Sequence, residues 1–347
     1  MNPTPSNEQM DSLFVSLFPA ALQRRERFIQ TLHEERTNAY RLFHGVAEGL
    51  PGLTLDRYNE LLLLQTFRDP LSEAQIISIE NELRKKISYP FRLIYNHRGK
   101  APTESFAQWH QPSAEALEEI QCQEQGLDFY IRGRHQGIDP WLFLDLRAGR
   151  RIVFKTVKDL SVLNLFAYTC SVGVTAAKGG AREVWNVDFS NSSLEVGRRN
   201  AELNQIPEER FKLIQEDCLP VMRQLAGLPV GLRNAKARPY LKVEARQFDL
   251  VFLDPPAWSK GPFGAVDVVG DYPTLFKSAV LATKPGGRVI ATNHIAKVAL
   301  DSWVDGLKRC AAKAGRALRS VETVSPDEDF PSSDGQHPLK TALCEVS

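Results

Sequence analysis

Strand-like and helix-like segments alternate along the chain from residue 160 to the C-terminus. The apolar, strand-like runs lie near 161–167, 183–187, 211–215, 248–253, 287–292, 317–324 and 339–346, and the helix-like segments lie near 172–179, 190–204, 217–227, 272–283 and 298–314. This alternation predicts an α/β fold, a mostly parallel sheet with helices on both faces. Because the last two strand-like runs lie close together, we expect the final strand to insert antiparallel. The prediction is a Rossmann-like, seven-stranded domain.

The first 125 residues are organised differently. Residues 1–38 are predicted to form a helical extension, because apolar side chains recur at roughly helical spacing after residue 11. Residues 39–125 alternate short apolar runs with glycine- and proline-rich turns, and they include an amphipathic helix near 71–87. They predict a small α/β domain that holds the substrate.

Residues 126–155 are predicted to form a β-hairpin bridge, with strands at 127–131 and 140–146, to a large domain at 156–347. Six cations lie between 132 and 155 against two acids: Arg132, Arg134, Arg147, Arg150, Arg151 and Lys155 against Asp139 and Asp145. Such a cluster suits a phosphate or a carboxylate ligand. A solvated hairpin face explains it equally well. Residues 228–246 are predicted to form an insertion between a helix and a strand, near the face of the large domain that carries the active site.

Composition restricts the class of protein. The chain of 347 residues has 43 Lys and Arg against 42 Asp and Glu, so a nucleic-acid site has to come from a local basic patch. The five cysteines are scattered without a Cys-x-x-Cys pair, which argues against a zinc site or a disulfide framework. No metal is expected. We find neither a signal peptide nor an apolar run of membrane-spanning length, so we expect a cytoplasmic protein without a membrane partner.

The loop after the first strand of the large domain suggests a type of cofactor. Residues 162–173 read as a strand, a tight turn and the start of a helix, which together offer backbone N–H groups to a ligand. A dinucleotide-binding loop needs three glycines, whereas this loop contains only Gly173. The loop therefore disfavours NAD and FAD and suits a ligand without a pyrophosphate, such as S-adenosylmethionine.

Acids follow the next two strands. Asp188 is expected to accept hydrogen bonds from ribose hydroxyls, and Asp217 to contact an adenine amino group. Each acid has a structural alternative, because acids at these positions also cap the following helix.

The sharpest motif is Asp254-Pro255-Pro256, followed by Trp258. The two prolines restrict the backbone, so the carboxylate and the carbonyls point in set directions at a strand end. Acceptors placed in this way can hold the N–H bonds of a target nitrogen so that its lone pair faces the methyl group. A nearby aromatic ring can stack on a flipped-out base. The alternative is a strand that ends at prolines beside a core tryptophan.

Together these segments resemble the bacterial S-adenosylmethionine-dependent methyltransferases of large-subunit (23S) ribosomal RNA, a family that includes the cytosine carbon-5 and guanine-N7 enzymes. The matching segments are 49–58, 143–147 with Arg150, 164–169, 188–190, 200–204 and 253–256. The resemblance covers residues from about 40 to 347 and implies that 156–347 form the methyltransferase domain.

The resemblance also implies roles for individual residues. Cofactor contacts are expected from Asp145, Arg147, Asn164, Phe166, Tyr168, Thr169, Gly173, Asp188, Phe189, Asp217 and Asp254. Catalytic roles are expected for Asp254, Pro255, Pro256 and Asn293, and substrate contacts for Trp258, His294 and Arg150. His294 is either a proton acceptor or base-edge contact, or a neighbour of a helix N-terminus.

Three features depart from the family pattern. Cys170 stands where the family usually has glycine, and the N-terminal RNA-binding barrel (the PUA module) is missing. Methylation of cytosine carbon-5 needs a cysteine nucleophile after the fifth strand, but residues 290–294 contain none. An asparagine turn at that position is closer to the guanine-N7 enzymes.

We therefore expect methylation of a base nitrogen in ribosomal RNA. Two alternatives stay open, namely a methyltransferase acting on a protein or small molecule, and a catalytically degenerate RNA-binding protein. The sequence does not choose between a monomer and a homodimer.

Overall fold

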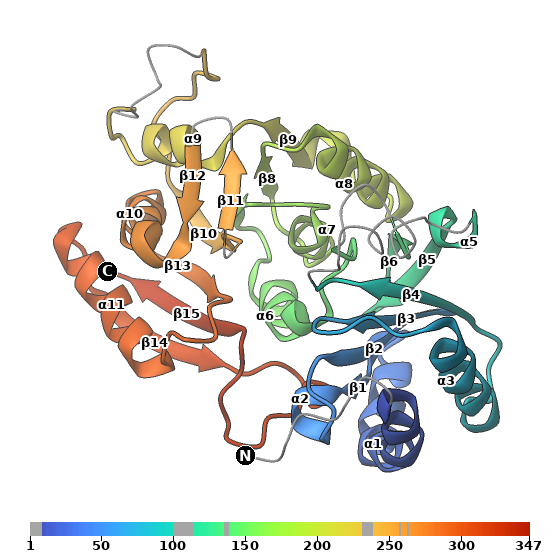
Figure 1. The fold of residues 1–347 in the computed structure, drawn as a ribbon. Coiled ribbons are helices and arrows are strands. Elements are labelled where there is room, and N and C mark those ends of the chain that lie inside the picture. The colour runs from blue at the N-terminus through green and yellow to red at the C-terminus, as the bar shows by residue number, and fades with distance from the viewer. Residues whose placement is uncertain (1–8, 100–113, 135–138, 231–238, 257, 262–263) are drawn as a thin grey trace. The chain divides into compact units, whose positions relative to one another are not determined.

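The computed structural model describes residues 9–99, 114–134, 139–230, 239–256, 258–261 and 264–347, and they form two compact units (Figure 1). Unit 1 comprises the chain to Leu144 together with Asp327–Gly335. Unit 2 comprises Asp145–Pro326 with Gln336–Ser347. Side chains of residues 257–270, and residues 231–238 of the predicted insertion at 228–246, lie outside the described structure.

Unit 1 contains a four-stranded sheet in the order β1-β2-β3-β4, in which only β3 and β4 are parallel. Its strands are β1 (Ala39–His44), β2 (Leu53–Tyr58), β3 (Leu61–Thr66) and β4 (Arg92–His97). Its helices are α1 (Met10–Glu34), α2 (Gly45–Glu48), α3 (Glu73–Lys86) and α5 (Ala114–Leu117). Helix α3 begins at a capping box in which Ser72 and Gln75 satisfy each other's backbone N–H groups.

Helix α1 belongs to the core of unit 1, whereas the sequence suggested a separate extension. Phe14, Phe18, Ala21 and Leu32 are fully buried in one cluster with the side chains of the sheet. The spacing predicted the helix correctly, but it carried no information about the surface that the helix would cover.

A segment from near the C-terminus completes unit 1. The Asp329 carboxylate accepts a hydrogen bond from the backbone N–H of Arg41 at 2.9 Å, and the Arg41 guanidinium lies 4.4 Å from the ring centroid of Phe330. Both Asp329 and Phe330 are buried. No local pattern in the sequence predicted this long-range contact.

The predicted hairpin bridge at 126–155 is wrong in its second strand. β5 (Glu119–Glu124) and β6 (Leu127–Arg132) form the hairpin, and 140–146 is not a strand. Residues Leu144–Leu146 form a 3₁₀ turn, η2, and Arg147–Thr156 form helix α6. A short apolar run does not distinguish a strand from a turn that leads into a helix, which explains the error.

Unit 2 contains a seven-stranded sheet in the order β14-β15-β13-β10-β7-β8-β9. Its strands are β7 (Ser161–Leu165), β8 (Glu183–Asp188), β9 (Phe211–Gln215), β10 (Phe248–Leu253), β13 (Thr283–Asn293), β14 (Leu318–Val324) and β15 (Lys340–Val346). Strand β15 lies between β13 and β14 and pairs antiparallel with both, while β13, β10, β7, β8 and β9 are parallel. The doubly wound fold and the antiparallel last strand are confirmed.

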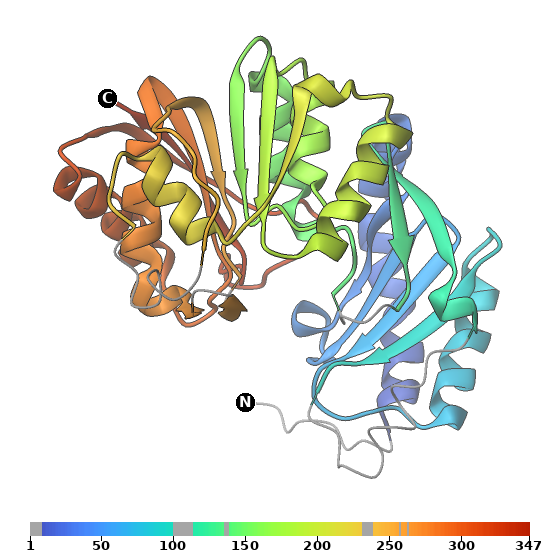
Figure 2. The same ribbon diagram turned by 90° about the horizontal axis from the view of Figure 1, so that it is seen from above.

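Two groups of helices flank this sheet. Helix α7 packs against α6 and α8, and α10 packs against α9 and α11, so that the groups lie on either side of the sheet (Figure 2). The helices beyond α6 are α7 (Ser171–Lys178), α8 (Asn191–Leu203), α9 (Cys218–Leu225), α10 (Val268–Leu281) and α11 (Leu300–Lys313), with a short turn η3 (Glu208–Arg210). A hairpin of β11 (Trp258–Gly261) and β12 (Gly264–Asp267) was not predicted. Among the described helices, none has the length and hydropathy of a membrane span.

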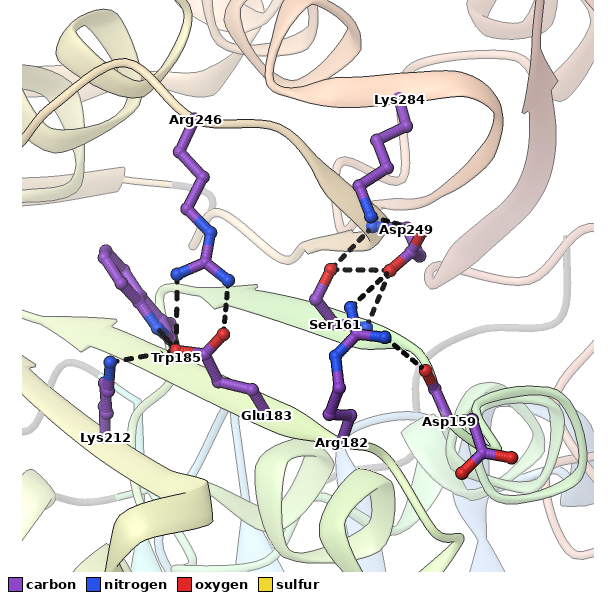
Figure 3. A network of polar contacts seen from close by, with 9 residues as sticks. All are labelled: Asp159, Ser161, Arg182, Glu183, Trp185, Lys212, Arg246, Asp249 and Lys284. Atoms are coloured by element: carbon purple, nitrogen blue, oxygen red, sulfur yellow. Dashed lines mark hydrogen bonds and ion pairs between the residues drawn. The ribbon is translucent and has the colours of Figure 1, made fainter.

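Ion pairs join the amino ends of the parallel strands (Figure 3). The Asp249 carboxylate accepts hydrogen bonds from the Ser161 backbone N–H at 2.9 Å and from Lys284 Nζ at 2.8 Å. Burial alone would raise the pKa of Asp249, but these hydrogen bonds outweigh it and lower the pKa to about 2. Because the pKa of Asp249 is lower in the folded protein than its ordinary value of 3.8, the ionised Asp249 carboxylate stabilises the fold above pH 3.8. This stabilisation is lost as the pH falls toward 2. The amino edge of the sheet is therefore structural.

Candidate functional site

The predicted site residues of unit 2 gather at the opposite, carboxyl edge of the sheet. Asp188 ends β8, Asp254 follows β10 and Asn293 ends β13, while Phe166 follows β7 and Asp217 precedes α9. Because these strands are parallel, their carboxyl ends meet at one edge. Ligands in doubly wound sheets bind outside this edge. The structure brings the predicted residues to one edge, and their binding of a ligand there stays a prediction.

The loop after β7 has an unusual backbone. Phe166, Tyr168 and Cys170 have positive φ angles of 58°, 49° and 60°, although none of them is glycine. The Tyr168 N–H donates to Asp188 Oδ2 at 2.8 Å, and the Phe166 N–H donates to the Cys218 sulfur at 3.2 Å. Strained conformations of this kind persist where surrounding contacts hold them, and they concentrate at ligand sites. The apolar run at these positions did not signal this alternation of backbone conformation.

Asp188 lies beneath this loop. Its Oδ1 accepts from the Ser190 N–H at 2.9 Å, in addition to the Tyr168 contact at Oδ2. Burial raises the pKa of Asp188, and the backbone hydrogen bonds oppose this rise. The N-cap of α8 is Ser190, whose hydroxyl accepts from the Ser193 N–H. The capping alternative for Asp188 is therefore wrong, and its remaining lone pairs suit hydroxyl donors.

The neighbouring Phe189 is 41% exposed, which is unusual for a large apolar side chain. An exposed ring beside a buried carboxylate suits a flat ligand that carries hydroxyl groups. Asp217 behaves differently from Asp188, because its Oδ1 accepts from the Leu219 N–H at 2.9 Å and caps α9. The cap that we considered as an alternative is thus present, and the contact of Asp217 with an adenine stays a prediction.

Asn164 and Gly173 lie below the loop, in the interior of unit 2. Asn164 Nδ2 donates to Asn186 Oδ1 at 2.9 Å, and both side chains are buried. A Cβ atom at residue 173 would lie only 1.9 Å from this Oδ1 atom. These residues therefore position the start of α7. Thr169 is also buried, and its carbonyl accepts from Asn200 Nδ2 at 3.1 Å. The sequence treated Asn164, Thr169 and Gly173 as direct cofactor contacts and did not anticipate this packing.

Cys170 is accommodated by a glycine on α8. It is fully buried, and a Cβ atom at residue 197 would lie 2.4 Å from its sulfur. Gly197 therefore provides the space that the cysteine side chain fills. The sequence alone suggested that Cys170 could narrow the cofactor loop; the structure instead directs its side chain toward α8.

We expect the substitutions Cys170→Gly and Gly197→Ala to be coupled. Gly197→Ala alone should destabilise the protein by about 1–3 kcal/mol, because the new methyl group overpacks the sulfur. In the Cys170→Gly background the same substitution should be nearly neutral, which gives a coupling energy of about 1–3 kcal/mol. Urea unfolding of the four proteins measures this energy, and additive effects would contradict the packing described.

A hydrogen-bonded group follows β10 and β13. Asp254 Oδ1 accepts from the Thr292 hydroxyl and lies 2.8 Å from His294 Nε2. Burial opposes ionisation of Asp254, but the charge of His294 and these hydrogen bonds outweigh it and lower the pKa of the carboxyl group. Burial likewise disfavours the charged form of His294, but Asp254 outweighs it and raises the pKa of the imidazole. The contact therefore favours the carboxylate form of Asp254 and the protonated form of His294.

The turn η2 and helix α6 contribute charges to the same group. Arg150 helps to lower the pKa of Asp254, and Asp145 helps to raise the pKa of His294. The side chains of Arg147 and Arg150 are fully buried. The structure therefore brings Asp145, Arg150, Asp254 and His294 into one electrostatic group. Because the sequence predicted a strand at 140–146 and no helix after it, this group depends on two elements, η2 and α6, that the sequence analysis missed.

The remaining predicted residues have mixed outcomes. Asn293 Oδ1 accepts from the Ile295 N–H at 2.8 Å and shapes the turn after β13, so its assigned catalytic role stays a prediction. Pro255 is buried and Pro256 is exposed, while the side chain of Trp258 lies outside the described residues.

Sequence reasoning did not identify two residues beside this group, Thr292 and Tyr272. The Tyr272 hydroxyl donates to the Thr292 carbonyl at 2.7 Å. Within the described residues, no group of three His, Cys, Asp or Glu side chains could hold a metal.

Comparisons with known proteins agree with this geometry. A family model described as S-adenosylmethionine-dependent methyltransferase matches residues 40–345. The chain is 29% identical over 320 residues to "Ribosomal RNA large subunit methyltransferase K/L" of Pseudoalteromonas atlantica, and the match covers 88% of this chain but only 40% of that protein. It is 25% identical over 331 residues to "Ribosomal RNA large subunit methyltransferase I" of Salmonella typhi, covering 93% and 77% of the two chains.

A solved structure shares the fold. SMU.776, assigned as a methyltransferase and complexed with SAH, superposes with a TM-score of 0.78 over 97% of this chain and 82% of that chain, at 20% sequence identity. At this level of identity, the likeness establishes the architecture of the chain.

Proposed function

We propose that this chain, which belongs to the family of S-adenosylmethionine-dependent methyltransferases, methylates a base nitrogen in large-subunit ribosomal RNA. Family membership establishes the reaction type and the cofactor, and it confirms the cofactor predicted from the sequence. The substrate class is the proposal. It is supported by the names of the two relatives above, which act on large-subunit ribosomal RNA, and by the polar group at Asp254.

The cofactor fits the residues at the carboxyl edge. The Asp188 carboxylate already accepts backbone N–H groups of Tyr168, Ser190 and Phe189, yet a carboxylate offers about four acceptor positions, which leaves room for a ribose hydroxyl. The exposed ring of Phe189 lies next in the chain and suits the adenine face. Asp217 would complete the nucleoside contacts. When bound, S-adenosylmethionine supplies a methyl group on an already activated sulfonium.

The cysteines argue for a nitrogen target. Methylation at carbon-5 of a pyrimidine requires a thiolate that adds to the ring, and only the thiolate is nucleophilic. Burial raises the pKa of Cys170, Cys218, Cys310 and Cys344, so these side chains are held as thiols. His294 follows β13 at the position where such a cysteine would be needed. This chain therefore lacks the thiolate that carbon methylation would use there.

Asp254 and His294 have defined roles in the proposed reaction. The Asp254 carboxylate would orient the target nitrogen and stabilise the positive charge that develops on the base. If the target is an exocyclic amino group, one N–H proton must leave as the N–CH₃ bond forms and the S–CH₃ bond breaks. The deprotonated form of His294, held in place by Asp254, is the acceptor for that proton.

The proposed substrate can be tested by methyl transfer. Purified protein is incubated with labelled S-adenosylmethionine and ribosomal RNA from cells that lack it, and the RNA is then digested to nucleosides. Label on a guanine or adenine nitrogen supports the proposal. Labelled 5-methylcytosine would overturn the cysteine argument, and cofactor binding without label on RNA would point to a protein or small-molecule substrate.

A further inference from the structure

A cavity of about 440 Å³ lies in unit 2 among helices α9, α10 and α11. Its lining combines cations, two hydroxyl groups and a glycine: Arg223, Leu228, Pro273, Thr274, Lys277, Ser278, Gly306, Arg309, Cys310 and Lys313. None of the residues assigned to cofactor binding or catalysis belongs to this lining. The cavity is therefore separate from the site at the carboxyl edge of the sheet.

The described residues that line this cavity carry charge of one sign. Four cations from three helices are among them, namely Arg223, Lys277, Arg309 and Lys313, and none of the described lining residues is a carboxylate. Arg309 and Lys313 are four residues apart on α11, where like charges repel by a few tenths of a kcal/mol. The helix dipole stabilises cations in the last turn of a helix. Lys277 lies before the last turn of α10, so the dipole does not stabilise it in this way. An anion in the cavity would offset this repulsion.

Gly306 keeps the cavity open. It lies inside α11, where glycine costs roughly 0.5–1 kcal/mol relative to alanine. Packing does not require a glycine there, because a Cβ atom at this position would meet only Arg309 Nη2, at 4.0 Å. A larger side chain at 306 would instead occupy the space between the cations.

We infer that this cavity binds a backbone phosphate of the RNA substrate, outside the target nucleotide. The identification of the anion as RNA rests on the proposed function, whereas the preference for an anion rests on the lining alone. The net charge of +1 leaves RNA affinity to local clusters such as this one. Arg309 and Lys313 are exposed at the surface, so a polymer can reach them.

Neutral substitutions at the cavity test this inference. Binding of an unmodified large-subunit ribosomal RNA transcript is measured against salt concentration for Lys277→Gln/Arg309→Gln and for wild type. Losing one phosphate contact should weaken binding several-fold at low salt and reduce the slope of log K against log [salt] by roughly 0.7–0.9. Lys308→Gln is the matched control, because Lys308 is an exposed cation on α11 that does not line the cavity.

A second pair of variants tests the space without changing charge. Gly306→Leu should weaken RNA binding by filling the cavity, while Gly306→Ala should bind RNA like wild type. Thermal unfolding confirms that each variant is folded, and the affinity for S-adenosylmethionine should be unchanged in all of them.

Unchanged RNA affinity and salt slope in the double variant would overturn the inference. The same holds if inorganic phosphate binds the cavity at low millimolar concentration without competing with RNA, since the site would then serve a free anion. A different result would contradict the proposed function. In that case the wild-type protein would bind RNA through the cavity but would transfer no methyl group to the RNA.

Discussion

Asp254→Asn is expected to reduce methyl transfer by about 10²–10⁴-fold while S-adenosylmethionine binds with nearly wild-type affinity. The substitution keeps the shape of the side chain but removes the charge that holds His294 and would orient the target nitrogen. Single-turnover transfer rates and calorimetric titration with the cofactor measure the two quantities. Loss of cofactor binding in parallel with loss of rate would contradict this catalytic role and would instead support the cofactor contact that the sequence analysis also expected of Asp254.

The pH dependence of the rate gives a second readout of the same variant. Asp254 raises the pKa of His294 above its ordinary value of 6.5, so deprotonated His294 becomes available only at higher pH. For an amino-group target, the wild-type rate should therefore rise through a pKa above 6.5. Asp254→Asn removes the negative charge, so the residual rate should rise at lower pH.

Two substitutions serve as controls for Asp254→Asn. Thr292→Val removes one hydrogen bond to Asp254 and leaves its charge in place, so the rate should fall much less. Asp249→Asn removes a carboxylate at the other end of β10. It should lower stability while leaving the pH profile of the rate unchanged, provided that the assay temperature lies below the melting point.

Gly173→Ala is expected to destabilise unit 2 by about 2–4 kcal/mol, which corresponds to a fall in melting temperature of roughly 5–15 °C. Two effects oppose each other at this position. Alanine favours a helix over glycine by about 1 kcal/mol, but its Cβ would lie 1.9 Å from Asn186 Oδ1 in a buried contact with Asn164. The clash wins because neither asparagine can move without losing a buried hydrogen bond.

Gly149→Ala is the matched control for Gly173→Ala. It also lies in a helix of unit 2, but its Cβ would make ordinary contacts of 3.8 Å. We expect unchanged or slightly increased stability. Calorimetry of the two variants, with cofactor titration, separates the effects, and a Gly173→Ala protein that melts like wild type would show that Asn186 relocates easily.

The sequence predicted the regular part of unit 2 because its signals are local. Apolar periodicity and the segments between strands indicated the seven strands of the large sheet, and hence the edge at which Asp188 and Asp254 lie. The rigid Asp254-Pro255-Pro256 corner could be recognised for the same reason. Helix α6 was missed because its start follows a short apolar run, and such a run fits a strand equally well.

The sequence by itself determined the doubly wound sheet, the edge at which the candidate site residues lie and the type of cofactor, since periodicity and strand-end chemistry follow from neighbouring residues. Only the tertiary structure decided which polar groups meet. It paired Asp254 with His294 and Thr292, matched Cys170 to Gly197, and placed Asp329 in the core of unit 1. These contacts join residues far apart in the chain, and their geometry depends on how whole elements pack, which no local pattern encodes.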